Sequence, residues 1–322
     1  MHKEKLYLAA DSGGSKTLWT LITENADILF EYRTQGVGAV RANIMPVYDI
    51  AMEAATKLKI YGEVTGIYFS LGGANTEEVR SVLESIWGDI PITVERESNG
   101  NAILYAASFL GCSSVVMCGT GSVAVGDTSE GRKYGGGWGP LYGDGGAGGG
   151  MGRDALCLFL RAVDGMEDIG EVYGLFSHLT EGLAIGKYAD RMELKRRALD
   201  MSRRELAALA SQIYLLAEKG DKCAIRLYEK AAQEVALLAK NVSDQTTKNV
   251  LLCGGFFMGK PFFLELCREA YSRYSDAVLC YNEKFSPITA ASISVLKTNG
   301  SIVNAELFKK ILNTERKKSK HE

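Results

Sequence analysis

One pattern constrains the fold of this chain most strongly, because it occurs twice. An apolar run, a tight glycine turn and a second apolar run occupy residues 6–23, with the turn at Asp11–Thr17. The same pattern returns at residues 114–127, with the turn at Gly119–Ser122. Each occurrence is typical of two strands joined by a tight turn. We therefore predict two lobes that are built on one plan.

Strands and helices alternate on both sides of this repeat, which predicts an α/β fold. In the first half we expect strands over 66–71 and 90–95, and helices over 46–61 and up to Trp87. In the second half we expect strands over 250–253 and 277–281, and helices over 261–274 and from Ser286-Pro287 onward. Between these halves, a capping box at Ser202–Glu205 and apolar residues at helical spacing predict a pair of packed helices.

The segment 131–152 is rich in glycine, and we interpret it as a functional loop rather than a core element. The domain organisation that follows is an N-terminal lobe over 1–112, rejoined by a C-terminal helix within 287–322. The second lobe would cover 113–286 and carry a helical insertion over about 150–245.

Composition excludes several classes of function. Hydrophobic residues make up 46% and charged residues 24% of 322 residues, which is the balance of a globular protein. No apolar run approaches the roughly 18 to 20 residues that span a bilayer, so no membrane partner is expected. A net charge of −2 gives no electrostatic basis for binding nucleic acid. Seven scattered cysteines without a C-x-x-C pair predict a reducing, cytoplasmic environment without disulfides or a zinc site.

The first glycine turn has the composition of a phosphate-binding loop. Glycines let backbone N–H groups approach a phosphate because no Cβ stands in the way, and hydroxyl and ammonium groups add donors. The candidate phosphate ligands are Gly13, Gly14, Ser15, Lys16 and Thr17. Asp11 ends the preceding strand, where its carboxylate could hold Mg²⁺ directly or through water. An ordinary hairpin turn is the alternative, since Asp and Gly are also favoured there.

The second turn offers the same chemistry through Gly119, Thr120, Gly121 and Ser122. Two such turns could face one triphosphate from opposite lobes. A third turn, Gly254-Gly255, follows a strand and would let an adenine ring lie against bare backbone. The run from Gly254 to Lys260 nearly spells a Walker A loop, but Pro261 replaces the hydroxyl residue that binds Mg²⁺.

In their order along the chain, these motifs resemble those of the actin–hexokinase–heat-shock-chaperone superfamily. The most similar branch contains the N-acetylglucosamine kinases and the BadF/BadG-type ATPases. Asp11–Thr17, Cys118–Ser122, Gly136–Gly139 with Gly143-Asp144, and Leu252–Gly255 carry the resemblance, which spans about residues 6–291. It implies two ribonuclease-H-like lobes with a nucleotide cleft between them, ATP and Mg²⁺ as cofactors, an amino sugar such as N-acetylglucosamine or glucosamine as substrate, and a homodimer.

The resemblance also implies a catalytic aspartate, and here the chain departs from the family. The family pattern N-D-A-x-A falls on Ser98–Ala102, so Asn99 stands at the position of the base. Asparagine can orient a hydroxyl but cannot accept its proton. Glu97 would need a two-residue shift that spoils the helix match through Ala106-Ala107. Because phosphoryl transfer depends mainly on positioning and charge stabilisation, binding should survive even where turnover is slow.

For the sugar, the resemblance implies contacts from Asn43 and from Asp144. Trp138 could stack on a sugar face, or it could be a buried structural tryptophan. Gly72 and Gly73, in the turn after the strand 66–71, complete the substrate-binding candidates. Gly145-Gly146-Ala147 replaces Glu-Gly-Ser of the family, and Gly148–Gly150 replace bulkier residues, which leaves the identity of the sugar open.

The sequence therefore leaves three alternative functions. The first is an ATP-dependent sugar kinase. The second is a sensor that binds ATP or sugar without turnover, which Asn99 favours. The third is an ATPase activator of a dehydratase or reductase, which would hold an iron–sulfur cluster between subunits through cysteines, although no suitable cysteine pair is evident.

Overall fold

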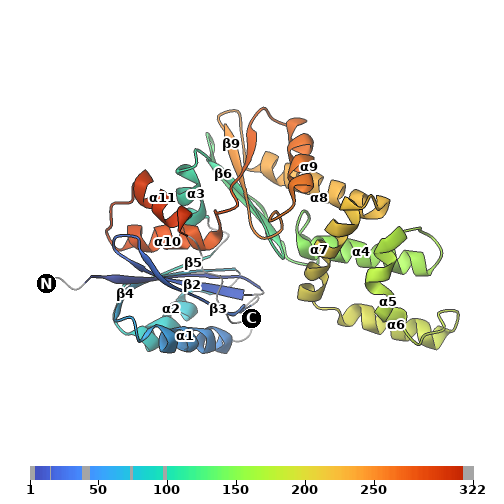
Figure 1. Cartoon of the computed structure of the whole chain (residues 1–322), viewed down its shortest axis with the longest axis horizontal. Helices are drawn as coiled ribbons and strands as arrows, with labels where there is room; N and C mark the ends of the chain where they lie inside the picture. Colours follow the sequence, from blue (N-terminus) through green and yellow to red (C-terminus); the bar gives the residue numbers. More distant parts are fainter. Residues whose placement is uncertain (1–3, 15, 38–43, 73–74, 97–99, 315–322) are drawn as a thin grey trace. The chain divides into compact units, whose positions relative to one another are not determined.

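The computed structural model describes residues 4–14, 16–37, 44–72, 75–96 and 100–314. The chain divides into two compact units, which are treated separately below (Figure 1). Unit 1 comprises Met1–Val115 and Asn282–Glu322, and unit 2 comprises Val116–Tyr281.

Unit 1 is built on a five-stranded sheet in the order β3-β2-β1-β4-β5. Its strands are β1 (Leu6–Ser12), β2 (Lys16–Thr23), β3 (Ile28–Gln35), β4 (Val64–Leu71) and β5 (Ile92–Arg96). The β1, β2 and β3 strands pair antiparallel, whereas β1, β4 and β5 pair parallel. The carboxyl ends of three parallel strands therefore meet at one edge of the sheet.

Helices cover both faces of this sheet (Figure 1). They are α1 (Met45–Leu58), α2 (Thr76–Trp87), α3 (Asn101–Ser108), α10 (Pro287–Thr298) and α11 (Ala305–Asn313). Apolar side chains of α1 and α2 share a core with Leu8, Trp19 and Phe69. The α10 helix contacts β1 and β4, so residues near the C-terminus complete the N-terminal unit.

Unit 2 repeats this plan with the order β10-β9-β6-β7-β8. Its strands are β6 (Ser114–Cys118, which begins in unit 1), β7 (Ser122–Thr128), β8 (Gly131–Gly136), β9 (Asn249–Cys253) and β10 (Val278–Tyr281). As in unit 1, the first strand is central, the next two lie on one side of it, and the last two lie on the other. The α/β fold and the two lobes on one plan, both predicted from the sequence, are confirmed.

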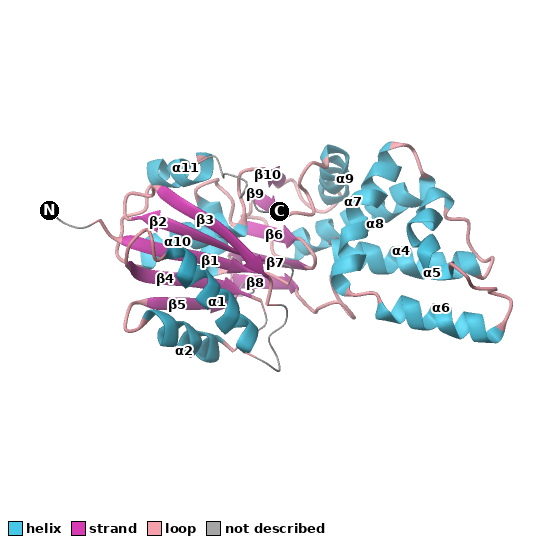
Figure 2. Ribbon diagram, turned by 60° about the horizontal axis from the view of Figure 1, so that its bottom comes forward, coloured by secondary structure: helices cyan, strands magenta, loops and turns pink. Residues whose placement is uncertain are grey.

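Most helices of unit 2 lie between β8 and β9 in the sequence, and α4 to α8 lie together in space (Figure 2). They are α4 (Gly148–Val163), the 3₁₀ helix η2 (Gly170–Phe176), α5 (Ser177–Thr180), α6 (Tyr188–Asp200), α7 (Arg203–Glu218) and α8 (Lys222–Asn241), with α9 (Pro261–Ser272) following β9. The predicted capping box begins α7, where Ser202 and Glu205 exchange hydrogen bonds. In the described part of the chain, no helix is both long and apolar enough to cross a bilayer.

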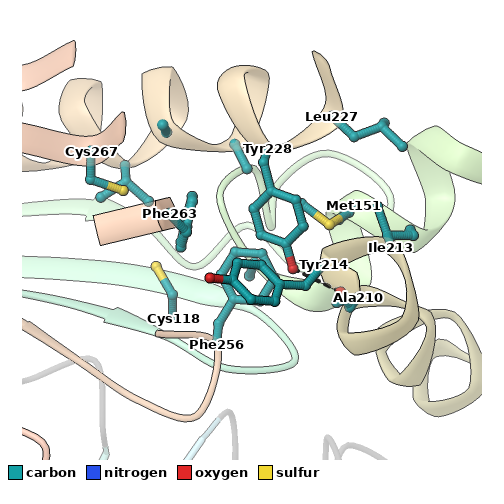
Figure 3. Packing of buried hydrophobic residues seen from close by; sticks show 14 of the residues in the cluster. Cys118, Met151, Ala210, Ile213, Tyr214, Leu227, Tyr228, Phe256, Phe263 and Cys267 are labelled. Atoms are coloured by element: carbon teal, nitrogen blue, oxygen red, sulfur yellow. Dashed lines mark hydrogen bonds between the residues drawn. The ribbon is translucent and has the colours of Figure 1, made fainter. Parts of the chain in front are cut away.

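An aromatic cluster fills the core where α8 and α9 meet the sheet of unit 2 (Figure 3). Tyr228, Phe256 and Phe263 are buried, with ring centroids 5.0 to 6.0 Å apart. The Tyr228 hydroxyl donates a hydrogen bond of 2.7 Å to the carbonyl of Ala210 on α7, which ties two helices together inside the core.

Two expectations from the sequence were wrong or incomplete. The segment 131–152 is not one loop, because its first residues form β8 and its last residues form the start of α4. The β3 strand, at residues 28–35, was not predicted.

The glycines of α4 are explained by close packing rather than by loop flexibility. A Cβ placed on Gly152 would lie 2.1 Å from the carbonyl oxygen of Leu206, on α7. A Cβ on Gly150 would lie 2.2 Å from the carbonyl oxygen of Asp144, and one on Gly148 would lie 3.1 Å from that of Ala207. Only glycine lets α4 approach these backbones so closely.

We predict that Gly152→Ala destabilises the protein by about 1–3 kcal/mol, because the new methyl group must push the α7 backbone away. The direction of the stability change is informative, because Gly→Ala inside a helix otherwise raises stability by roughly 0.5–1 kcal/mol. The matched control is Gly186→Ala, where a Cβ would meet nothing within 4 Å. Urea denaturation of both variants measures the effect, and equal midpoints for the two would contradict the packing argument.

Candidate functional site

The first glycine turn joins β1 to β2 and is closed by its own backbone. The N–H of Gly13 donates to the carbonyl of Lys16 at 2.9 Å. Beneath the turn, the hydroxyls of Ser12 and Thr17 are 2.8 Å apart and both side chains are buried. Thr17 therefore braces the turn from inside, whereas Gly14 and Lys16 are exposed. Ser15 lies outside the described residues.

Three polar residues form a row across the parallel strands of unit 1. Asp11 on β1 pairs in register with Ser70 on β4, which pairs with Glu95 on β5. Residues in register on parallel strands share one face of the sheet. Asp11 is half-buried and its carboxylate lies beside the glycine turn. Gly72 follows the end of β4 and is half-buried, while Gly73 lies outside the described residues.

Glu95 anchors the start of α3. Its carboxylate accepts hydrogen bonds from the backbone N–H of Asn101 at 2.8 Å and of Ala102 at 3.2 Å. It also accepts a hydrogen bond from the hydroxyl of Tyr68, and only 7% of the residue is exposed. A carboxylate at this end of a helix satisfies N–H groups and interacts favourably with the helix dipole. Asn99, at the expected base position, lies outside the described residues.

The second glycine turn, between β6 and β7, is held by the first residues of α4. The N–H groups of Gly148 and Gly149 donate to the carbonyls of Gly119 and Thr120, each at 2.9 Å. The hydroxyl of buried Ser122 donates to the carbonyl of Gly145 at 2.7 Å. Backbone from the start of α4 and from the loop before it thus fixes the conformation of the turn.

Asp144 is buried, with 3% of its surface exposed, and its carboxylate is already engaged. One oxygen accepts from the N–H of Ser122 at 3.3 Å, and the other from Nη2 of Arg203 at 2.7 Å. Its backbone is left-handed, with φ of 63°. The residue predicted to bind sugar therefore links the second turn to α7 in this structure.

The third turn meets the second one directly. The N–H of Phe256 donates to the carbonyl of Cys118 at 3.0 Å, and a Cβ on Gly254 would lie 2.3 Å from that same oxygen. Gly254 has φ of 107°, which a side chain would strain. Gly255 follows it, where a Cβ would meet nothing within 4 Å.

Lys260 lies just after this turn and is 7% exposed. Its ammonium group is 5.8 and 5.7 Å from the ring centroids of Tyr214 and Phe256, and 3.4 Å from the carbonyl of Met258. Burial lowers the pKa of Lys260 below its ordinary value.

Trp138 is 77% exposed, so it is not a buried structural tryptophan. It lies on the loop after β8. Arg153, on α4, forms hydrogen bonds with the backbone of that loop. Nη1 of Arg153 donates to the carbonyls of Pro140 at 2.8 Å and Gly143 at 3.1 Å. Asn43, the other expected sugar ligand, lies outside the described residues.

Among the predicted residues, the turns at Gly119–Ser122 and Gly254-Gly255 come together with Asp144 in unit 2. The turn at Gly13 belongs to unit 1. Sequence reasoning gave no role to Ser12, to Glu95 or to Arg203. The alternation of β5 could have indicated a buried Glu95, but no local signal marks Arg203 as the partner of Asp144.

We predict that Glu95→Gln lowers the free energy of unfolding by about 1.5–3 kcal/mol, because the charged acceptor of three hydrogen bonds is lost. Tyr68→Phe is the matched control, since it removes one donor and leaves the carboxylate on α3, with a smaller loss of about 1 kcal/mol. Urea denaturation compares the two variants. Wild-type stability for Glu95→Gln would show that Glu95 does not anchor α3.

We predict that Lys260→Met changes how stability depends on pH. Between the lowered pKa of folded Lys260 and its ordinary value near 10.4, the unfolded chain binds more protons, so wild-type stability rises with pH relative to the variant. Denaturation of both proteins at several pH values from 7 to 10 measures this difference. Parallel profiles would mean that burial does not penalise the charged amine.

Most of the chain matches known proteins and solved structures. An N-acetylmuramic acid/N-acetylglucosamine kinase of Clostridium acetobutylicum is 26% identical over 264 residues, which cover 78% of this chain and 85% of that protein. An N-acetyl-D-glucosamine kinase of Dictyostelium discoideum is 27% identical over 265 residues, covering 75% and 80%. The structure of a candidate N-acetylglucosamine kinase from Chromobacterium violaceum superposes with a TM-score of 0.72 at 17% identity, covering 91% and 99%.

A family model extends this likeness from single relatives to a defined group. It matches residues 10–283, which include all three glycine turns and the helices between β8 and β9. The resemblance inferred from the motifs is therefore confirmed, and the chain belongs to the BadF/BadG/BcrA/BcrD ATPase family.

Proposed function

We propose that this protein is an ATP-dependent kinase that transfers the γ-phosphoryl group to a hydroxyl of an amino sugar. One observation carries the proposal. In each unit a glycine turn joins the central strand to its neighbour, in sheets of the same strand order. Membership of an ATPase family supports ATP as the nucleotide, and two relatives named as N-acetylglucosamine kinases support the substrate class.

In this proposal each glycine turn offers backbone N–H groups to phosphate oxygens. In unit 1 the contacts would come from Gly14 and Ser15, with charge from Lys16, while the N–H of Gly13 closes the turn onto the carbonyl of Lys16. Thr17 supports them from beneath, because its hydroxyl is bonded to Ser12. In unit 2 they would come from Thr120 and Gly121, while the N–H of Gly119 donates to the carbonyl of Gly121 and Ser122 supports the turn through Gly145. Gly254 and Gly255 would receive the adenosine.

Mg²⁺ fits the neighbourhood of Asp11. Among the described residues, no cluster of three or more His, Cys, Asp or Glu side chains could cage a metal. Mg²⁺ does not need such a cage, since it is commonly held by one or two carboxylates together with substrate phosphates and water. A half-buried carboxylate beside a phosphate-binding turn meets that requirement. When bound, the ion would neutralise charge that develops on the phosphates.

For the sugar, the exposed indole of Trp138 offers an apolar face on which a pyranose ring can stack. Asn43, Gly72 and Gly73 would line the remainder of the sugar site. Asp144 would contribute a carboxylate oxygen while it stays bonded to Arg203. The names of the two relatives favour a 2-acetamido sugar as the acceptor.

Asn99 at the position of the base lowers the rate of phosphoryl transfer that we expect. A general base contributes about 10²–10⁴-fold to a reaction, and asparagine cannot supply it. Glu95 does not replace it, because its carboxylate is buried and bonded to α3 and Tyr68. We therefore expect a slow kinase, and the second candidate, a sensor that binds without turnover, is favoured by this one substitution.

An activator with an iron–sulfur cluster between subunits is less consistent with the cysteines. All seven lie in the described residues; five are buried, Cys280 is partly exposed and only Cys157 is exposed. A cluster shared between two chains needs accessible thiols. The cytoplasmic location and the homodimer remain predictions, and light scattering would measure the oligomeric state.

We predict that purified protein releases ADP from Mg-ATP slowly, and faster with N-acetylglucosamine or N-acetylmuramic acid than with glucose. Asn99→Asp should raise the sugar-dependent rate by about 10²–10⁴-fold, because it restores a proton acceptor. Asn101→Asp is the matched control, with the same change in charge two residues further along. A coupled assay for ADP measures all three proteins.

Each result assigns a function. Sugar-dependent ADP release by the wild-type protein supports the kinase. Tight binding of ATP and sugar without ADP, together with activation by Asn99→Asp, supports a sensor that lost its base. Activation by Asn101→Asp instead would move the base to the first residue of α3. No binding of ATP by any variant would refute both candidates.

A further inference from the structure

The guanidinium of Arg203 lies against the second glycine turn, although 81 residues or more separate it from that turn in the sequence. A Cβ placed on Gly121 would lie 2.3 Å from Nη2 of Arg203. A Cβ on Gly149, whose N–H holds Thr120, would lie 3.7 Å from Nε of Arg203. The first residue of α7 thus reaches the part of unit 2 that is proposed to bind phosphate.

The guanidinium of Arg203 has N–H donors that the hydrogen bond to Asp144 does not use. Arginine carries five N–H groups, and Nη2 provides the hydrogen bond to Asp144, at 2.7 Å. Among the described residues, Nε is buried without a hydrogen-bond partner. The side chain as a whole is 39% exposed, so part of it faces solvent. A buried donor without an acceptor is costly, and a phosphate oxygen would satisfy it.

The second glycine turn has no cation of its own, so a cation from another segment would help it to bind phosphate. The turn in unit 1 contains Lys16, whereas Gly119–Ser122 contains no basic residue. Phosphoryl transfer depends on cations that stabilise charge on the phosphates. A guanidinium suits this task because its planar donors match phosphate oxygens in pairs.

Asp144 orients this cation. Its two oxygens bind the N–H of Ser122 and Nη2 of Arg203, so one buried carboxylate fixes both the turn and the guanidinium. A buried carboxylate is tolerated only when it is paired and hydrogen-bonded, which explains why the two residues occur together.

We propose that Arg203 binds the polyphosphate of the nucleotide at the second glycine turn, and that Asp144 positions it there. This inference rests on the proposed function, because it assigns a ligand to the same turn. It adds a residue from the helices between β8 and β9 to the nucleotide site.

The test measures nucleotide affinity by isothermal titration with Mg-ATP, Mg-ADP and AMP. Arg203→Met should weaken binding of Mg-ATP and Mg-ADP by about 10- to 100-fold, the range for a lost hydrogen bond to a charged group. AMP should lose less than about threefold, because it lacks the polyphosphate. Arg203→Lys should restore part of the loss, because it keeps the charge.

Two further variants separate binding from folding. Arg204→Met removes the same charge from the next position of α7, where the side chain is exposed, and should bind all three nucleotides like the wild type. Asp144→Asn combined with Arg203→Met leaves no unpaired buried charge, so it should fold and still bind Mg-ADP weakly. Thermal unfolding of each variant shows which of them are folded.

The outcomes are distinct. Selective loss of ATP and ADP affinity in folded Arg203 variants supports the inference. Wild-type affinities in the double variant overturn it, as does an equal loss for AMP and ADP, which would indicate a purely structural ion pair. If the wild-type protein binds no nucleotide, the proposed function itself fails, and the inference fails with it.

Discussion

The second unit depends on how closely α4 approaches its neighbours. The N–H groups of Gly148 and Gly149 reach the carbonyls of Gly119 and Thr120, and Gly152 lies against the backbone of α7. A side chain at any of these glycines would push the segments apart. The conformation of the glycine turn and the position of α7 therefore follow from the same contacts. Without them, Arg203 would not reach the turn.

The two units share a strand order but support their turns differently. In unit 1 the support is local, because Ser12 and Thr17 lie five residues apart and bond beneath the turn. In unit 2 it is long-range, through α4, Asp144 and a residue of α7. The helices between β8 and β9 thus support the second turn as well as the core. The turn of unit 1 contains its own lysine, whereas the turn of unit 2 lies against an arginine from another helix.

Local patterns predicted those elements that local physics determines. The strand–turn–strand segments alternate apolar residues around glycines, and the capping box at Ser202–Glu205 is formed by neighbours in the sequence. The segment 131–152 was misread because glycine has no side chain to show whether it serves a loop or a tight contact. The edge strand β3 was missed because its residues are mostly only partly buried, so its apolar periodicity is weak. Packing against distant backbone leaves no periodic trace in the sequence.

By itself, the sequence determined that two lobes share one plan, that three glycine turns follow buried strands, and that asparagine occupies the expected base position. These features depend on residues close together in the chain. Only the tertiary structure decided that Thr17 points inward, that Glu95 anchors α3, and that Asp144 pairs with Arg203, 59 residues away. The reason is physical: a hydrogen bond needs its partners within about 3 Å, and which distant residues meet at that distance is set by the packing of whole helices and sheets.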